Sequence, residues 1–223
     1  MNRPFLARRV FITGGTGYIG TRVIPLLRKH GHSVIALSRE SSPRKLPPDC
    51  SLVIGDALNG ESYKDHLSEC DTFIHLVGVS HPGPAKARQF VEIDLKSARE
   101  AIRVAHNAGI QHFIYMSVAH PAPVMKAYID VRSSCEDALR ETGMNATILR
   151  PWYVLGPGHR WPVVLKPFYR LAESFPAMRD GARRLGLVTL DEMVNTVVSV
   201  TEDPASGVWI VEVPEIRSRG HAL

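Results

Sequence analysis

The residues near the amino terminus contain a glycine pattern that can bind the phosphates of a nucleotide. The apolar residues 10–12 are followed by Gly14, Gly17 and Gly20, three positions apart. Between a strand and a helix, such glycines let the chain turn sharply, let its backbone approach a pyrophosphate and let the helix pack closely. The free N–H groups and positive dipole end of the helix favour an anion there. Residues 9–29 therefore predict a strand, a phosphate-binding turn and a helix.

The end of the second predicted strand, residues 33–37, indicates which dinucleotide would fit. An acidic residue at this point binds the 2′-hydroxyl of the adenosine ribose, whereas an arginine nearby accommodates a 2′-phosphate. Ser38 and Arg39 occupy the position and no aspartate does, which favours NADP over NAD. Arg22 and Arg44 could assist, because a guanidinium binds phosphate oxygens through two hydrogen bonds. The alternative is that Arg39 is only a solvated charge at the strand exit.

The string TGGTGYIG at residues 13–20, with GxxGxxG spacing, resembles the extended and atypical short-chain dehydrogenases/reductases, including the NAD-dependent epimerase/dehydratase and NmrA-like groups. The resemblance implies a Rossmann fold that binds NAD(P). Asp56 would meet the adenine amino group, although it could instead cap the following helix. Together with Ser38 and Arg39, the implied cofactor-binding residues are Gly14, Thr16, Gly17, Tyr18, Ile19, Asp56, Ala57, Leu76, Val77, Gly78, Arg132 and Pro151.

The same resemblance implies a catalytic tyrosine and lysine four residues apart on one helix, with a serine at the end of the fifth strand. Residues 149–151 resemble the LRP motif of the family, and counting back from them places Tyr128, Arg132 and Ser117 at these positions. Residues four apart share a helix face, and a nearby cation favours the phenolate form of a tyrosine. We therefore expect Tyr128 to transfer a proton, Ser117 to hold the substrate oxygen and Arg132 to bind the nicotinamide ribose.

Two departures from the family pattern keep other functions open. Arg132 replaces lysine with a larger, planar cation, and Tyr128 follows Ser117 by only 11 positions, fewer than in most extended enzymes. The first hypothesis is an NADP-dependent oxidoreductase acting on a small carbonyl or alcohol substrate. The second is a non-catalytic NADP-binding sensor or regulatory protein, in which Tyr128 would be a structural tyrosine. The third is a nucleotide-sugar epimerase or dehydratase.

Two histidines lie in loops that follow predicted strands. His81 comes after the fourth strand, and His120 follows Ser117 in a proline-rich loop. Either imidazole could donate a proton near a nicotinamide ring, because histidine titrates in the physiological range. The alternative is that both are solvated loop residues.

Strand-like and helix-like segments alternate through most of the chain. Parallel strands need such crossover connections, so the alternation predicts an α/β fold of the Rossmann type, a doubly wound parallel sheet. The later predicted strands are residues 51–55, 71–77, 112–116 and 146–150, and the predicted helices are residues 61–67, 85–107 and 125–142.

The chain changes character at Pro151, after which tryptophan and proline residues interrupt the patterns. We therefore divide it into an NAD(P)-binding domain, residues 1–150, and a small C-terminal substrate-binding region, residues 151–223, packed on it. The expected elements of this region are helices at 163–173 and 190–201, an extended segment at 185–188 and a strand at 208–213. The aromatic group of this region forms either the wall of a pocket or the contact between the region and the NAD(P)-binding domain. Its members are Trp152, Tyr153, His159 and Trp161.

Composition and charge argue against several other classes of protein. The chain has 223 residues, 44% of them hydrophobic, and no segment with the roughly 18 uninterrupted apolar residues of a membrane span. Residues 1–9 lack the apolar centre of a signal peptide, so we expect a cytoplasmic protein. Three widely spaced cysteines without a CxxC pair, and ten histidines without ligand spacing, predict neither a disulfide framework nor a metal site.

The net charge of +5 could suggest nucleic acid, but the basic residues are dispersed along the chain. An anionic cofactor accounts for part of the excess. The partners that we expect are a small-molecule substrate and, by analogy with dimeric relatives, a second copy of the chain that pairs through the helices at 85–107 and 125–142.

Overall fold

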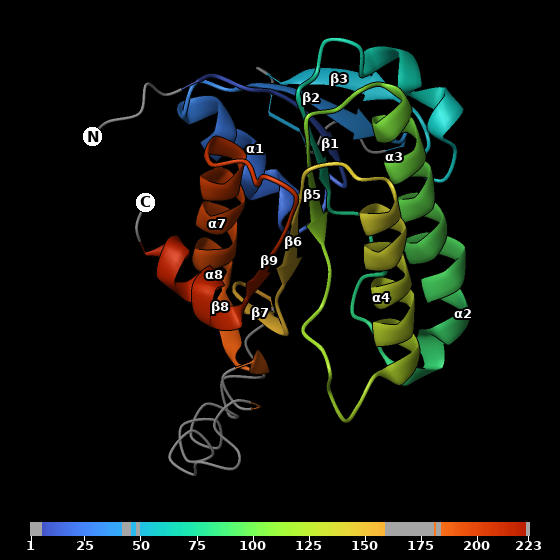
Figure 1. Ribbon diagram of the computed structural model, residues 1–223, viewed down its shortest axis with the longest axis vertical. Coiled ribbons are helices and arrows are strands. Elements are labelled where there is room, and N and C mark those ends of the chain that lie inside the picture. Colours follow the sequence, from blue (N-terminus) through green and yellow to red (C-terminus); the bar gives the residue numbers. More distant parts are fainter. Residues whose placement is uncertain (1–5, 42–45, 48–49, 159–180, 182–183, 222–223) are drawn as a thin grey trace.

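A parallel sheet of seven strands runs through the middle of the protein (Figure 1). The computed structural model describes residues 6–41, 46–47, 50–158, 181 and 184–221. The strand order is β3-β2-β1-β4-β5-β6-β9, which confirms the doubly wound Rossmann-type fold. The strands are β1 (Arg9–Thr13), β2 (Ser33–Ser38), β3 (Ser51–Ile54), β4 (Thr72–His75), β5 (His112–Met116), β6 (Ala146–Arg150) and β9 (Val208–Glu212).

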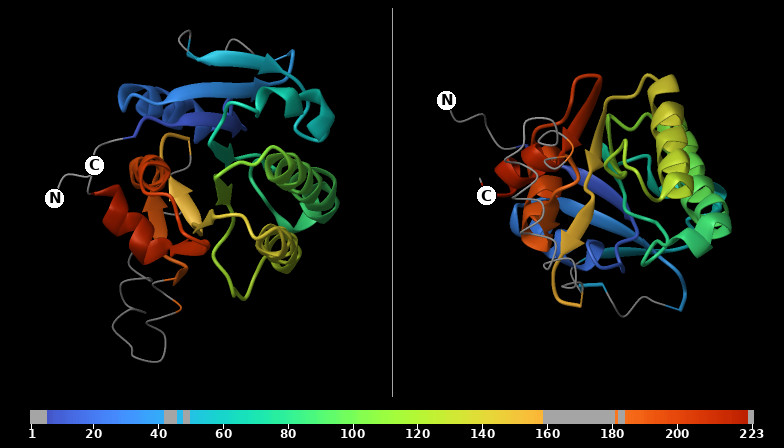
Figure 2. Two further views of the ribbon diagram at one scale, coloured as in Figure 1. Left: turned by 45° about the horizontal axis from the view of Figure 1, so that its top comes forward. Right: turned by 90° about the horizontal axis from the view of Figure 1, so that it is seen from below.

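Helices cover both faces of the sheet (Figure 2). One face carries α3 (Lys96–Asn107) and α4 (Lys126–Glu141), and the other carries α1 (Gly20–Lys29), α7 (Leu190–Glu202) and α8 (Val213–Gly220). Because successive side chains of a strand point to opposite faces, Phe11 packs towards α3 and α4 while Val10 and Ile12 pack towards α1 and α7. Burial on both faces explains why the central strands read as continuous apolar runs.

Two expected helices on the α3 side differ in detail. Residues 61–67 form two 3-10 turns, η2 (Gly60–Ser62) and η3 (Lys64–His66), instead of one helix. The side chains of Asn59 and Ser62 bond to nearby backbone groups, and such local bonds compete with the α-helical pattern. The expected helix at 85–107 is continuous in space but begins with η4 (Pro84–Lys86), α2 (Ala87–Gln89) and the π-helical η5 (Phe90–Leu95) before α3.

The chain after residue 150 contributes to the sheet. Its last strand, β9, pairs with β6 along five residues, from Val208 to Glu212, and α7 packs beside α1. The strands β7 (Tyr153–Leu155) and β8 (Leu187–Thr189) form a separate parallel pair. The division at residue 150 stays a prediction, and the expected helix at 163–173 lies outside the described residues. No helix in the described part of the chain is both long and apolar enough to cross a bilayer.

A complete capping box starts α7. The Thr189 side chain accepts the Glu192 N–H, and the Glu192 carboxylate accepts the Thr189 N–H, which satisfies two free donors of the first turn. The helix expected at 190–201 is therefore present, whereas α8 was not expected.

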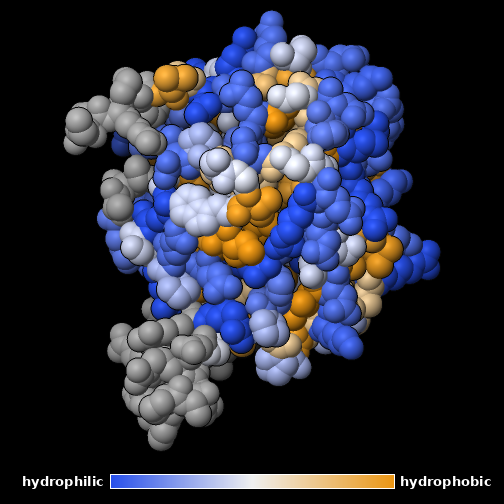
Figure 3. Space-filling view, in the orientation of Figure 1, coloured by the Kyte–Doolittle hydropathy of each residue, from blue (hydrophilic) through white to orange (hydrophobic). Residues whose placement is uncertain are grey.

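The face of the protein seen in Figure 3 is mostly hydrophilic, with apolar side chains gathered near its centre, close to β6 and β9.

Candidate functional site

The glycine turn between β1 and α1 lies at the carboxyl end of the central strand. Gly14 has φ +78°, and a Cβ atom there would stand 2.7 Å from the Leu76 carbonyl carbon. A Cβ at Gly20 would collide with the Gly14 carbonyl oxygen. A hydrogen bond from the Gly17 N–H to the Gly14 oxygen, 3.0 Å long, closes the turn. The turn therefore requires glycine at 14 and 20 for its own packing.

Gly17 has a different environment. Among the described residues, a Cβ there would meet only the Gly14 oxygen within 4 Å, at 3.1 Å. The Ile19 side chain makes no capping bond to α1, and the first turn of α1 contains no acidic residue. Open space above Gly17 and an uncapped, positively polarised helix start are what a pyrophosphate needs. The residues present therefore fit the phosphates of a dinucleotide.

The other expected residues of the turn surround it. Thr16 and Tyr18 are partly exposed, and the Tyr18 ring lies under the Arg22 guanidinium, 5.1 Å from ring centroid to carbon. Arg22 also donates to the Tyr18 carbonyl oxygen at 2.9 Å. The Tyr18 hydroxyl lies against Gly156, because a Cβ on that glycine would collide with it. Arg22 is thus bound to the turn.

The ends of β2 and β3 place the expected adenosine-binding residues. Arg39 is exposed, and the buried Ser38 hydroxyl donates to the Arg39 carbonyl oxygen at 3.1 Å. The Asp56 carboxylate accepts the Leu58 N–H at 2.9 Å, but the cap of the following turn η2 is Asn59 and not Asp56. Ala57 packs partly buried against the core. Arg44 lies outside the described residues.

The segment after β4 approaches the glycine turn from the neighbouring strand. The Leu76 N–H bonds to the Thr13 carbonyl oxygen, and the Leu76 and Val77 backbone closes against Gly14. Gly78 is exposed, and a Cβ there would collide with the Arg132 guanidinium. This contact links the predicted cofactor segment to the predicted catalytic cation.

Arg132 is buried, with 3% of its surface exposed. Its guanidinium makes an ion pair of 2.5 Å with Asp94, which is fully buried, and donates to the Met116 carbonyl oxygen at 2.7 Å. Burial raises the pKa of Asp94, and the neighbouring Arg132 opposes this shift. The Asp94 carboxylate also accepts the Val79 N–H. The cation thus ties α4 to η5 and to the end of β5.

Tyr128 lies in the first turn of α4, partly buried. Its ring packs at a tilt against Phe90, with centroids 4.9 Å apart, and the Arg132 guanidinium lies 5.1 Å from its centroid. The Tyr128 hydroxyl makes no hydrogen bond within the described part of the chain. Tyr128 and Arg132 therefore do share one side of the helix, with the phenol oxygen available to a ligand.

Ser117 follows β5 and is 4% exposed. Its hydroxyl donates to the Glu136 carboxylate at 2.6 Å, so its one hydrogen is already used. Glu136 lies on α4 one turn beyond Arg132 and is fully buried. Pro151, which ends the LRP motif, is buried, and its carbonyl oxygen accepts the Ala119 N–H.

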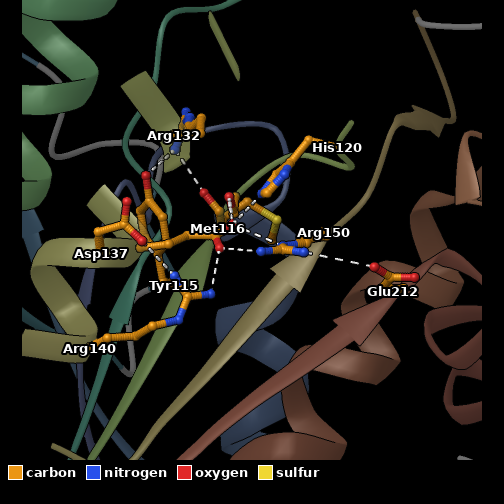
Figure 4. Close-up of polar contacts among 10 residues, drawn as sticks. Tyr115, Met116, His120, Arg132, Asp137, Arg140, Arg150 and Glu212 are labelled. Carbon is orange, nitrogen blue, oxygen red and sulfur yellow. Dashed lines mark hydrogen bonds and ion pairs between the residues drawn. The ribbon is translucent and has the colours of Figure 1, made fainter. Parts of the chain in front are cut away.

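Glu136 is the centre of a polar cluster that includes two residues considered from the sequence, Ser117 and His120. Figure 4 shows His120, Arg140 and Arg150, which belong to this cluster. Arg150 donates to both carboxylate oxygens, Arg140 donates at 3.0 Å, and His120 lies at 3.3 Å. Burial opposes ionisation of Glu136, but the hydrogen bonds from Arg150 and Ser117 outweigh it and lower its pKa. The sequence contains one indication that Glu136 belongs to the site, because it lies four positions after Arg132, as Arg132 lies four positions after Tyr128.

The structure describes both loop histidines and two of the four members of the aromatic group. His81 is exposed and has φ +52°, whereas the His120 side chain is 19% exposed. Trp152 and Tyr153 pack edge to face with centroids 6.1 Å apart. His159 and Trp161 lie outside the described residues.

A seven-stranded parallel sheet with a glycine turn over its central strand defines an NAD(P)-binding protein of the Rossmann class. A family model described as NAD(P)H-binding matches residues 14–164, more than half of the chain, and the chain belongs to this family. The resemblance inferred from the glycine string is confirmed.

Curated relatives include dehydrogenases and reductases. The chain is 27% identical to the 3-beta-hydroxysteroid dehydrogenase of Mycolicibacterium neoaurum over 48% of its length and 31% of the relative. It is also 27% identical to the ceramide reductase of Caulobacter vibrioides, over 95% of its length and 66% of the relative. The chain thus spans less than two thirds of both relatives.

Solved structures with the same fold include NAD-binding enzymes. The Bordetella bronchiseptica enzyme WbmH in complex with NAD+ aligns with a TM-score of 0.70 at 19% identity, covering 93% of this chain and 76% of that one. The UDP-N-acetylglucosamine 4-epimerase of Bacillus cereus aligns with a TM-score of 0.68 at 17% identity, covering 92% and 78%. At such identities the likeness shows the fold alone.

Proposed function

We propose that this protein is an NADP-dependent oxidoreductase that interconverts an alcohol and a carbonyl on a small substrate. The observation that carries the proposal is the open space above Gly17 beside the uncapped start of α1. When bound, the nicotinamide ring supplies hydride transfer. The dehydrogenases and reductases among the relatives support the reaction class, and a hydroxyl or keto group on a steroid or lipid is the substrate class that their names suggest.

The residues that would hold the cofactor follow the carboxyl edge of the sheet. Residues 14–19 would bind the pyrophosphate, and the segment from Leu76 to Gly78, with Pro151, would contact the nicotinamide half. Asp56 and Ala57 would lie at the adenine. The exposed Arg39, and a serine in place of an acid at the last position of β2, support a 2′-phosphate, and hence NADP, at Ser38 and Arg39.

Tyr128 is the proposed acid/base residue, because its hydroxyl has no partner in the described structure and a cation lies against its ring. Ser117 would contact the substrate oxygen. Since its hydrogen is bonded to Glu136, Ser117 could accept a hydrogen bond from a substrate hydroxyl without rearrangement, but donating one to a carbonyl would break that bond.

A non-catalytic NADP-binding protein is the second candidate. The observation in its favour is that the Arg132 guanidinium already donates hydrogen bonds to Asp94 and to the Met116 carbonyl oxygen. These bonds leave Arg132 less able to bind the nicotinamide ribose. An epimerase or dehydratase of nucleotide sugars is the third candidate, supported by the fold shared with such enzymes. Pairing of two copies through α3 and α4 stays a prediction.

Cofactor binding and turnover separate these candidates. Titration of the protein with NADPH and NADH should give tighter binding of NADPH, and Arg39→Ser should reduce that preference by about tenfold, the value of one charge-assisted phosphate contact. Equal affinity in the wild type would contradict NADP selection.

Turnover of paired secondary alcohols and ketones should fall by about 10² or more in Tyr128→Phe while NADPH affinity holds. Turnover that survives this change would remove Tyr128 from the mechanism. Tight NADPH binding without turnover of any pair would favour the sensor. Turnover of UDP-sugars with no net change in the cofactor would favour the epimerase.

A further inference from the structure

The partly buried His120 and the fully buried Glu136 form an imidazole–carboxylate pair next to the predicted site. His120 lies in the loop that joins β5 to α4, at the carboxyl edge of the sheet where ligands of such folds bind. Its Nε2 atom is 3.3 Å from a Glu136 oxygen. In Figure 4 the His120 imidazole points towards the polar side chains gathered beside Arg150.

The charges around Glu136 determine which imidazole nitrogen carries the hydrogen. Arg150 donates to both carboxylate oxygens and Arg140 to one of them, so Glu136 is held as an anion. An ionised carboxylate only accepts hydrogen bonds, and Nε2 must therefore be the protonated nitrogen of a neutral His120 ring.

The other nitrogen, Nδ1, has no partner among the described residues and is not sealed from solvent. In the tautomer that Glu136 selects, Nδ1 carries a lone pair. A carboxylate that fixes the tautomer of an imidazole and stabilises its protonated form is the arrangement by which histidine becomes an effective base.

We propose that His120 is a second proton-transfer residue of this site and that Glu136 is its positioning residue. This inference rests on the proposed function. As a substrate hydroxyl is oxidised, a hydride would pass from its carbon to a bound oxidised nicotinamide, its O–H bond breaks and Tyr128 takes the proton. Nδ1 then receives this proton from Tyr128, giving an imidazolium that Glu136 stabilises. In the reductive direction, Nδ1 returns the proton to Tyr128, which gives it to the carbonyl oxygen.

The two arginines that bind Glu136 are also close to other carboxylates. Arg140 also bonds to Asp137, and Arg150 lies 3.8 Å from Glu212. Each arginine therefore has a second carboxylate beyond Glu136 (Figure 4). Ser117 donates to the same Glu136 oxygen that His120 approaches, which joins the two loop residues to one anchor on α4.

The tautomer can be measured without any substrate. Nitrogen NMR of ¹⁵N-histidine-labelled protein, at a pH where the ring is neutral, should show His120 with Nε2 protonated and Nδ1 bare. Glu136→Gln should weaken that preference, because an amide can donate as well as accept. The exposed His106 on α3 provides the control signal. A wild-type His120 with Nδ1 protonated would overturn the proposal, even if the Glu136 variant failed to fold.

The catalytic role requires a separate measurement. With cyclohexanol and cyclohexanone, and with a 3β-hydroxysteroid and its ketone, as probe pairs, His120→Ala should lower kcat by about 10² or more. NADPH affinity should not change, and added imidazole should restore part of the rate. His106→Ala serves as the matched control. Undiminished kcat in His120→Ala would overturn the proposal while leaving the oxidoreductase intact.

Failure of the proposed function gives a different result. If the wild type binds NADPH but turns over none of these pairs, the oxidoreductase is refuted and the catalytic role of His120 is refuted with it. The wild-type NMR signals then still decide whether Glu136 sets the tautomer.

Discussion

Removing one partner of the Asp94–Arg132 ion pair should destabilise the protein strongly. Both side chains are almost fully buried, and their closest atoms are 2.5 Å apart. Asp94→Asn keeps the size of the side chain and an oxygen for the Val79 N–H, but leaves the Arg132 charge buried without a counter-charge. Breaking a buried pair in this way costs about 3–5 kcal/mol, a large share of the roughly 5–15 kcal/mol that stabilises a typical domain.

Urea denaturation followed by circular dichroism measures this loss. With a slope of about 3 kcal/mol per molar urea, the expected midpoint falls by about 1 M or more. Arg132→Met should cost a similar amount, because it leaves the Asp94 carboxylate unpaired. The double variant Asp94→Leu/Arg132→Met should be far more stable than the sum of the single changes predicts, since replacing both charges avoids their desolvation.

Strict additivity of the two single changes, or a loss below about 1 kcal/mol for Asp94→Asn, would refute this account of the pair. The double variant also tests whether Arg132 binds the nicotinamide ribose. If it binds NADPH as tightly as the wild type does, Arg132 is not a ligand of the nicotinamide ribose, and its function is to tie α4 to η5 and to the end of β5.

Two further predictions concern buried histidines and the glycine turn. Burial lowers the pKa of His75 to about 3 and that of His112 to about 4. From an unfolded value near 6.5, each should contribute stability that is complete above that pH and is lost as the pH falls, about 4 kcal/mol together between pH 7 and 5. Urea midpoints measured across that range should show it, and an unchanged slope in His112→Gln would contradict it. In the turn, Gly17→Ala should weaken NADPH binding by about tenfold with little change in the urea midpoint, whereas Gly20→Ala should destabilise the fold; equal destabilisation by both would contradict the distinction.

Local patterns were sufficient to predict the sheet. The apolar strands and the glycines at 14, 17 and 20 act on neighbouring residues, so their effect can be read from short windows of sequence. The helix α8 was missed because residues 208–213 read as one strand. The signal was Pro214, which is compatible with the first turn of a helix and not with the interior of a central strand.

The buried charges of the site could not be predicted in the same way. Asp94 and Arg132 are 38 positions apart, and Arg150 and Glu136 are 14 apart, so only the fold brings each pair together. A charged residue in a helix is usually solvated, and nothing local distinguishes Asp94 or Glu136 from an exposed acid. Their burial follows from the position of α4, whose apolar side chains share one core cluster with those of the sheet and which also packs against η5.

The arrangement along α4 links these observations. Tyr128, Arg132 and Glu136 follow one another by one helical turn each, and the two charged members are anchored to the strand ends by different partners. Arg132 binds Met116 and Asp94, while Glu136 binds Ser117, His120 and Arg150. Of the three candidate proton-transfer residues Tyr128, Ser117 and His120, the Tyr128 hydroxyl and the His120 Nδ1 have no hydrogen-bond partner in the described structure, whereas Ser117 donates to Glu136. If the site transfers protons, these two groups are where the chemistry can occur, and the buried charges hold the helix and loop that carry them.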